Sequence, residues 1–581
     1  MVRCPPVGLR LPAAEIVFAA ASMAAVLAGA VVAASACLLL FYPFWDRWWR
    51  PWQIKRCLRR QGISGPPPRL FSGNLHERNV LRRQATLSHM PYLSHDIVPR
   101  LLPDYVQWSK VYGKSFLFWW GAEPRLAVYD LDQIKELLSS KHVHMLGRSE
   151  LQRRGVAHFI GQGLLMANGQ AWSHQRRTVA PAFHSQNLKH QVSHMINCTM
   201  EVSQEWSRML EMKDEIEVEV SDCMSHLAGE IIARTQFSND YKKGKQIFIK
   251  LGELQRLSIK SSNLNHAQRQ RVQHLKHQVE SMFMEIITSR MSRVFLNPST
   301  QEEKFNETVS SRYGHDFLGL VLAEIDICKQ KAMVNLGHPH GCKNIIRRHH
   351  MFQNKTGEEE LEERIYSSQH LMDECKTFFF TGHETTWLLL TWTFMLLASY
   401  PSWQERAREE AIIAMKNTFG LPQFDMLSKL QVLDMILLET LRLYTPATIL
   451  AREAFTDIKV GNLEIPKGLS VWVPVLAIHH DKDIWGEDAN EFKPERFANG
   501  VSKSCKHPMA FMPFSFGPRN CVGQNFAMME AKIVLSLLLS RFSFELSPSY
   551  IHAPICILTL QPKYGVPIIV RRIKSDTLSI I

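Results

Sequence analysis

The spacing of apolar residues along the chain predicts a mainly helical protein with a few short strands. Three stretches carry apolar residues at helical spacing and charged residues on the opposite face. These are residues 186–213, 245–260 and 268–293. A more apolar stretch from Glu362 to Leu397 predicts a long buried helix. Short runs typical of strands lie at 116–128, 458–473 and 555–570. We expect mainly α structure with small β-sheets.

The N-terminal segment has the pattern of a membrane anchor. No residue from Ile16 to Tyr42 is charged, and this stretch exceeds the ~20 residues that a spanning helix needs. Basic residues and tryptophans follow it, which predicts a short lumenal N-terminus at 1–15, an anchor at 16–42 and a cytosolic remainder. These flanking residues are Trp45, Arg47, Trp48, Trp49, Arg50, Trp52, Lys55, Arg56, Arg59 and Arg60. A long cleaved signal sequence is the alternative.

Two further boundaries follow from proline, glycine and charge. Residues 43–75 form a basic and aromatic flank that ends in a proline-rich hinge at Gly65–Pro68. The catalytic body then occupies 76–581, and its irregular stretch 335–363 is predicted to be an exposed loop. The loop's His338, His340 and Cys342 could be read as a metal site, but a solvated polar loop is the simpler interpretation.

The charge and cysteine content of the chain indicate which kinds of partner it binds. The 581 residues carry a net charge of +13, which suits anionic lipid or an acidic docking partner. No basic stripe interleaved with aromatic residues occurs, so we expect no nucleic-acid binding. The 11 cysteines show no metal or disulfide spacing, which favours a reducing compartment and leaves room for one chemically special cysteine.

The long apolar helix contains an unusual polar segment, Thr381–Thr386. Polar groups in so apolar a helix must be paired or functional. Threonine hydroxyls can bond back to a carbonyl one turn earlier and bend a helix. Two interpretations stand equally: a bent helix that holds water or dioxygen beside a cofactor, or a structural kink with satisfied threonines.

The loop Phe514–Gly523 is the most informative stretch. Two glycines and a proline make it tight, and it leads directly into the helical pattern of 524–541. Cys521 therefore lies at a helix N-terminus, where dipole and free N–H groups stabilise a thiolate. Gly523 lets the backbone approach a flat ligand, and Arg519 offers a cationic fork to a carboxylate. A thiolate of this kind is a strongly donating axial ligand for haem iron.

This loop resembles the haem-binding signature of the cytochrome P450 superfamily, F-x-x-G-x-R-x-C-x-G, at every fixed position. The resemblance implies a cytochrome P450 fold behind a single N-terminal transmembrane helix. It also implies haem b, Cys521 as the iron ligand, and electrons from NADPH through a separate NADPH–cytochrome P450 reductase. The implied haem contacts are Trp172, Arg176, Arg452, Phe514, Arg519, Cys521 and Gly523. The implied oxygen-activating residues are Thr385 and Glu384, and the implied structural ion network is Glu439, Arg442 and Arg496.

Longer stretches resemble the plant cytokinin trans-hydroxylases, among them HDIVPRLLPDYVQWSKVYGK and LMDECKTFFFTGHETT. This implies hydroxylation of the isopentenyl side chain of N6-isopentenyladenine nucleotides at the endoplasmic reticulum membrane. Some positions depart from the pattern: Thr381 replaces Ala or Gly, and Thr445 replaces a frequent proline. The stretch 263–271 is also short and the 335–363 loop long, near regions that select substrate.

Other functions remain open at this point. A gibberellin or brassinosteroid oxidase would keep the chemistry and change the substrate. A haem-binding membrane protein with little turnover is an alternative of a different class, which Thr381 and the short 263–271 stretch keep open. A receptor-like membrane module without haem is a further alternative.

Overall fold

In the computed structural model of the chain, the structure describes residues 49–69, 72–259, 265–296, 313–335 and 368–573, with Gly29, Ala30 and Ser35. Most of the predicted anchor, part of the 263–271 stretch and all but the first residue of the predicted loop 335–363 lie outside these ranges, as do His338, His340 and Cys342. Within the described ranges, no helix is both long and apolar enough to cross a membrane.

Helices make up most of the described chain, as the apolar spacing predicts. The helices are α2 (Arg50–Arg60), α3 (Leu75–Thr86), α4 (Val98–Leu101), α5 (Pro103–Tyr112), α6 (Leu131–Leu137), α7 (Glu150–Val156), α8 (Gly169–Val179), α9 (Ser185–Lys189), α10 (Val192–Met209), α11 (Val220–Phe237), α12 (Tyr241–Ile259), α13 (His266–Leu296), α15 (Phe317–Asn335), α17 (Ser368–Ser399), α18 (Pro401–Met415), α19 (Gln431–Leu443), α20 (Val475–His479), α21 (Lys482–Trp485) and α22 (Gln524–Leu539).

The strands form four small sheets. They are β1 (Phe116–Trp120), β2 (Glu123–Ala127), β3 (Leu146–Gly147), β4 (Glu215–Glu219), β5 (Leu450–Ala454), β6 (Ile458–Val460), β7 (Leu463–Ile465), β8 (Ser470–Val473), β9 (Phe542–Leu546), β10 (Pro554–Cys556), β11 (Leu560–Pro562) and β12 (Pro567–Arg572). The largest sheet has the order β1-β2-β8-β5-β3, and β4-β12-β9 form a second. The remaining two are the hairpins β6-β7 and β10-β11.

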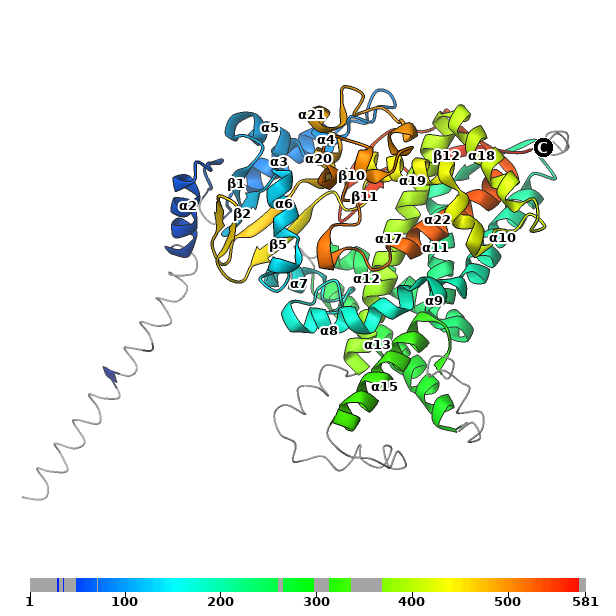
Figure 1. Cartoon of the computed structure of the whole chain (residues 1–581), viewed down its shortest axis with the longest axis horizontal. Coiled ribbons are helices and arrows are strands. Elements are labelled where there is room, and N and C mark those ends of the chain that lie inside the picture. The colour runs from blue at the N-terminus through cyan, green and yellow to red at the C-terminus, as the bar shows by residue number, and fades with distance from the viewer. Residues whose placement is uncertain are drawn as a thin grey trace, which may run out of the picture.

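The five-stranded sheet lies toward one end of the molecule, and the long helices of the core lie toward the other. Figure 1 shows the five-stranded sheet with α2 at one end, and α10, α11, α17 and α22 at the other. Strand β1, with the sequence FLFWW, is buried along most of its length, because its aromatic side chains pack on both faces. Only the β2–β8 pair is parallel; the other pairings of this sheet are antiparallel.

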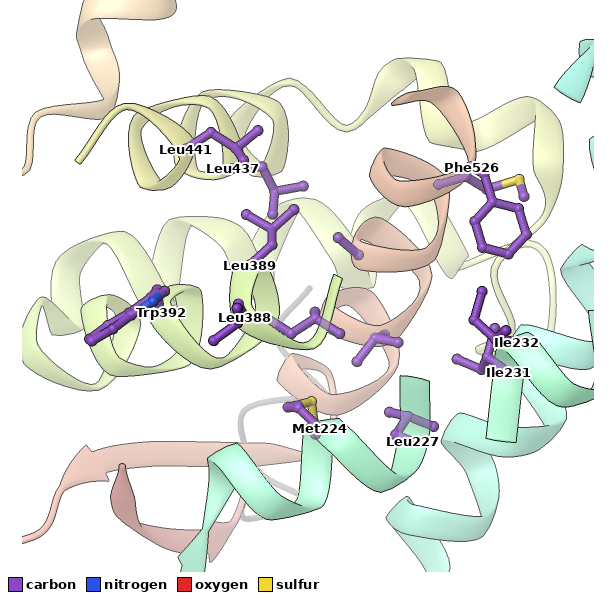
Figure 2. Packing of buried hydrophobic residues seen from close by; sticks show 14 of the residues in the cluster. Met224, Leu227, Ile231, Ile232, Leu388, Leu389, Trp392, Leu437, Leu441 and Phe526 are labelled. Carbon is purple, nitrogen blue, oxygen red and sulfur yellow. The ribbon is translucent and has the colours of Figure 1, made fainter. Parts of the chain in front are cut away.

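The helical core surrounds α17. Its Leu388, Leu389 and Trp392 are almost inaccessible to solvent, and Figure 2 shows them between side chains of α11 and α19. Ile231 and Leu437 represent those two helices in the cluster. Burying apolar side chains of this size contributes ~1.5–3 kcal/mol each, so this packing fixes the position of the polar segment of α17.

The segment predicted as a flank and hinge is packed against the body between residues 49 and 69. Helix α2 buries Ile54 and Leu58 in the apolar cluster of the five-stranded sheet. Ser64 accepts a hydrogen bond from the backbone N–H of Leu117 at 3.0 Å, so the chain runs beside β1 just before the prolines. The apolar positions of α2 cause this packing, although basic residues dominate its sequence.

The structure modifies two predicted helices. The predicted helix 186–213 is divided into α9 and α10, and the side chain of Gln191, which lies between them, donates to the carbonyl of His315 at 2.7 Å. Both parts still pack on one core, which explains the continuous apolar spacing. The predicted helix at 362–397 is α17, which runs without interruption from Ser368 to Ser399.

Candidate haem-thiolate site

The loop before α22 is held in a strained shape that presents Cys521. The backbone N–H of Cys521 donates to the carbonyl of Phe514 at 2.8 Å, which closes the loop. Gly517 has φ +71°, and a Cβ there would lie 1.9 Å from the carbonyl oxygen of Leu138, so this position requires glycine. Ser515 also has a positive φ, of 64°. Strain of this kind persists where the surroundings enforce it, as they often do at functional sites.

The Cys521 side chain is accessible, yet protein surrounds it closely. Both facts hold if the sulfur faces an internal space instead of bulk solvent. Burial raises the pKa of the thiol, and it outweighs a hydrogen bond from the Gly523 N–H and the charge of Arg176. The Gly523 N–H at the start of α22 favours the thiolate, as the sequence predicts, but burial outweighs it. A metal ion at the sulfur would stabilise the thiolate, because coordinating thiols lose their proton.

Three arginines converge beside this loop. Burial lowers the pKa of Arg148 to about 10, and burial and Arg148 together lower that of Arg519 to about 9. The pKa of Arg452 is lowered further by burial, with contributions from Arg148 and Arg519. Among the described residues, none of the three pairs with a carboxylate; their hydrogen bonds go to backbone carbonyls. Buried cations without a counterion require an anionic ligand.

These observations fit haem. The thiol is a ligand for iron, and the three arginines match the two carboxylates of the porphyrin. At Gly523 an added Cβ would meet only Phe183, at 3.7 Å, so protein atoms leave room beside the backbone. The sequence analysis missed Arg148. Strand β3 brings it to the site by pairing with β5, which carries Arg452.

Two other predicted haem contacts act on the loop itself. Arg176 donates to the backbone carbonyl and the side-chain oxygen of Asn520, each at 2.8 Å, and so fixes the residue before Cys521. Trp172 is buried, and the guanidinium of Arg519 lies over its ring at 4.9 Å. In this structure both residues therefore support the loop and its arginine. A direct bond from either to haem stays a prediction.

The polar segment of α17 keeps a regular helix. The Thr385 hydroxyl donates to the carbonyl of Thr381, and the Thr381 hydroxyl to that of Thr377, both at 2.7 Å. The expected back-bonding is present, and the helical assignment continues through it. The hydroxyl of Thr381, a departure from the family pattern, is thus taken up by the backbone. Thr445 is buried with no hydrogen bond to its hydroxyl among the described residues.

Glu384 is buried at 4% exposure, next to Thr385. Its carboxylate accepts hydrogen bonds from Gln255 at 3.1 Å, and from Thr559 and Gln561 at 2.7 Å each. The sequence analysis did not find these partners, because they come from α12 and the β10–β11 hairpin.

The predicted ion network is assembled, and its Glu439–Arg442 pair is fully buried. Arg442 and Glu439 form a two-point pair at 2.7 and 2.8 Å, and both side chains have no exposure. Arg442 also donates to the carbonyls of His479 and Ala489, while Arg496 reaches Glu439 at 3.3 Å. A buried charge cluster is stable only with its partners in place, and here each charge has several.

A mainly helical fold with an accessible loop cysteine and an uncompensated arginine cluster defines a haem-thiolate protein. Residues 98–566 match the Cytochrome P450 family, and the chain belongs to this family. It is 45% identical over 532 residues to a cytokinin hydroxylase of Arabidopsis thaliana, which covers 90% of this chain and 93% of the relative. A second protein of that name from the same plant is 44% identical, covering 91% and 95%. Cytochrome P450 709B1 of Arabidopsis thaliana is 37% identical, covering 93% and 97%. The chain is thus a haem b monooxygenase that receives electrons from a separate reductase.

Proposed function

We propose that this enzyme hydroxylates the isopentenyl side chain of N6-isopentenyladenine nucleotides and forms the trans-zeatin nucleotide. The observation that carries this proposal is the 44–45% identity, over nine-tenths of the chain, to two proteins named cytokinin hydroxylase. Cytochrome P450 709B1 and Cytochrome P450 734A1 of Arabidopsis thaliana are 37% and 34% identical to this chain. The mutual electrostatic effects of Arg148, Arg452 and Arg519, and of Arg176 and Cys521, support the oxygenation chemistry, because they put the residues that could hold haem near one another.

Different residues of the chain would hold haem, exclude water and supply protons. Cys521 would hold the iron and Arg148, Arg452 and Arg519 the two carboxylates, and the bound haem would supply dioxygen activation. The apolar side chains of α11 and α17 exclude water from the space around it. Thr385 carries a hydroxyl proton at Oγ1, now donated to a backbone carbonyl, that a turn of the side chain would offer to the site. Glu384 lies behind it as a carboxyl that can replace that proton.

Electron transfer requires a docking face near the cysteine loop, and we propose a basic one. Arg177 follows Arg176 on α8 and is exposed. Lys141, which is exposed and pairs with Glu136 at 2.7 Å, lies three residues beyond Leu138, whose carbonyl touches Gly517 of the loop. Cations in these places suit an acidic reductase surface and would speed its association.

We further propose that the chain is anchored in the endoplasmic reticulum membrane through residues 16–42, with its catalytic body in the cytosol. Helix α2 supports this proposal from outside the anchor. Its buried face is apolar, whereas Trp49 and Trp52 are 41% and 49% exposed, and the guanidinium of Arg56 lies over the Trp52 ring at 5.4 Å. Exposed tryptophan beside basic residues is typical of a membrane–water interface. Removing residues 1–42 should release the protein from microsomes, and continued sedimentation with them would contradict the anchor.

The test of the reaction uses microsomes that contain this protein and a plant reductase. With NADPH and isopentenyladenosine monophosphate, mass spectrometry should detect the trans-zeatin nucleotide, and the Cys521→Ala protein should give none. The carbon monoxide difference spectrum of the reduced protein controls for folded holoenzyme. A normal spectrum without product would contradict the substrate and direct the search to gibberellins and brassinosteroids. A normal spectrum without turnover on any of these would favour a haem-binding protein with little catalysis.

A further inference from the structure

The side chain of Glu384 joins three separate elements. It belongs to α17, while its partners lie on α12 and on the hairpin β10–β11 (Figure 1). Its donors among the described residues are all neutral: two amides and one hydroxyl. A buried carboxylate without a cation depends on such bonds for its charge. Its orientation is therefore set by these three side chains.

The two carboxylate oxygens have different surroundings. Oε1 accepts from the Thr559 hydroxyl and the Gln561 amide, both at 2.7 Å, and these donors also lie 3.2 Å from each other. Within the described part of the chain, Oε2 accepts from the Gln255 amide alone, at the longer distance of 3.1 Å. The hairpin thus fixes one oxygen firmly, whereas α12 covers the other with a single bond.

Helix α12 has little else that binds it to α17. The ring of Phe248 stacks on that of Phe379, with centroids 3.6 Å apart, one turn before Glu384. The other contacts of α12 are mainly with α11 and α13, including a hydrogen bond from Lys250 to Gln278 at 2.9 Å. A movement of α12 would therefore break the bond at Oε2 and leave the bonds at Oε1 intact.

We propose that Thr559, Gln561 and Gln255 are positioning residues for Glu384, and that α12 controls access to its Oε2 oxygen. An amide N–H cannot deliver a proton at neutral pH, so Gln255 covers Oε2 and does not relay protons. When α12 moves away, Oε2 can take a proton from solvent water, and bulk solvent neutralises the hydroxide ion that remains. The carboxyl then gives this proton to the Thr385 hydroxyl as that hydroxyl releases its own proton into the site, and the carboxylate is restored. The inference rests on the family's oxygenation chemistry and not on the choice of substrate.

Two substitutions test the position of the carboxylate. Thr559→Val keeps the side-chain shape but removes the donor to Oε1, and Thr559→Ser keeps the donor. In the full-length enzyme with reductase, Thr559→Val should raise the peroxide released per NADPH roughly tenfold, as expected for a lost hydrogen bond to a charged group. It should also increase the solvent deuterium isotope effect, while Thr559→Ser matches the wild type. Equal behaviour of the Val and Ser variants would overturn the positioning role.

The Glu384→Ala variant shows whether Thr559 and Gln255 act by positioning Glu384 or by packing in general. If Thr559 and Gln255 act through Glu384, then Thr559→Val and Gln255→Leu should change nothing further in protein that already carries Glu384→Ala. Additive changes in peroxide release would show that they act elsewhere and would overturn the proposal.

The proposal that Gln255 covers Oε2 of Glu384 can be tested without measuring turnover. Hydrogen exchange of α12 amides should become faster by the same factor in Gln255→Leu, in Glu384→Ala and in the double variant, because all three lack the bond between Gln255 of α12 and Glu384 of α17. The control Gln278→Leu removes an α12 bond on another face, and its effect should add to that of Glu384→Ala. Unchanged exchange in Gln255→Leu would refute the covering role. This result does not depend on whether isopentenyladenine nucleotides are the substrate.

Discussion

The arginine cluster predicts that one substitution has different effects on the haem-free and the haem-bound protein. Arg519→Met removes a cation whose pKa falls from 12.5 to about 9 through burial and Arg148. At 1.36 kcal/mol per pKa unit, keeping this cation costs at most ~5 kcal/mol. The substitution also loses bonds to the carbonyls of Ala167 and Leu146 and the contact with Trp172, ~1 kcal/mol each. The haem-free protein should therefore keep its stability or gain up to ~2 kcal/mol.

Haem affinity should change in the opposite direction. A charge-assisted hydrogen bond to a haem carboxylate contributes ~1.5–3 kcal/mol, so haem affinity should fall ten- to a hundredfold. Denaturant unfolding of the haem-free protein and haem transfer to apomyoglobin measure the two quantities. Arg541→Met is a matched control, because Arg541 is a partly buried arginine bonded to the Leu537 carbonyl. A haem-free Arg519→Met protein that loses several kcal/mol, with haem affinity unchanged, would refute the anionic-ligand argument.

Four further changes test other parts of the structure. Cys521→Ala should abolish the thiolate-type carbon monoxide spectrum, and its retention would overturn the ligand assignment. Thr385→Ala should retain haem but release peroxide in place of product, so coupled turnover would contradict its role. Arg442→Leu should cost ~3–5 kcal/mol, because it removes the two-point partner of the buried Glu439 and leaves Arg496 as its cation, measured as loss of soluble holoprotein. Glu374→Gln should stabilise the protein at pH 8–9 and not at pH 5. Burial raises the pKa of Glu374 to about 8, so the stability of the wild type falls as pH rises from about 4.5 through 8.

The sequence predicted those parts of the site whose residues lie close together along the chain. The loop around Cys521 and the pair Glu439–Arg442 each lie within a few residues of one another, so local geometry fixes them. The positions of α17 and α22 also follow from long apolar runs, because any stable packing of the chain must bury such runs. Roles that only the family resemblance implies stay predictions. Arg176, for example, bonds Asn520 in the loop, and its contact with haem is untested.

The parts that the sequence could not predict depend on pairing between distant segments. Arg148 becomes a haem-facing candidate only because β3, two residues long, pairs with β5. The partners of Glu384 come from a hairpin and from α12, and nothing in their own sequence marks Thr559 or Gln561 as functional. Helix α2 was missed because basic residues mask its apolar positions, Ile54 and Leu58.

The charges of Glu439 and Arg442 are neutralised within the protein, whereas those of the arginine cluster need an anion from outside. This difference suggests an order of assembly. Glu439 and Arg442 satisfy each other within the protein, so the folded chain needs no ligand to keep them buried. The arginines at positions 148, 452 and 519 repel one another until an anion arrives, which makes the haem-free site less stable than its surroundings. Haem should therefore bind a body whose ion network is already formed. On this reasoning, haem binding slows hydrogen exchange around β3, β5 and the cysteine loop far more than in α19, and uniform protection of both regions would argue against that order.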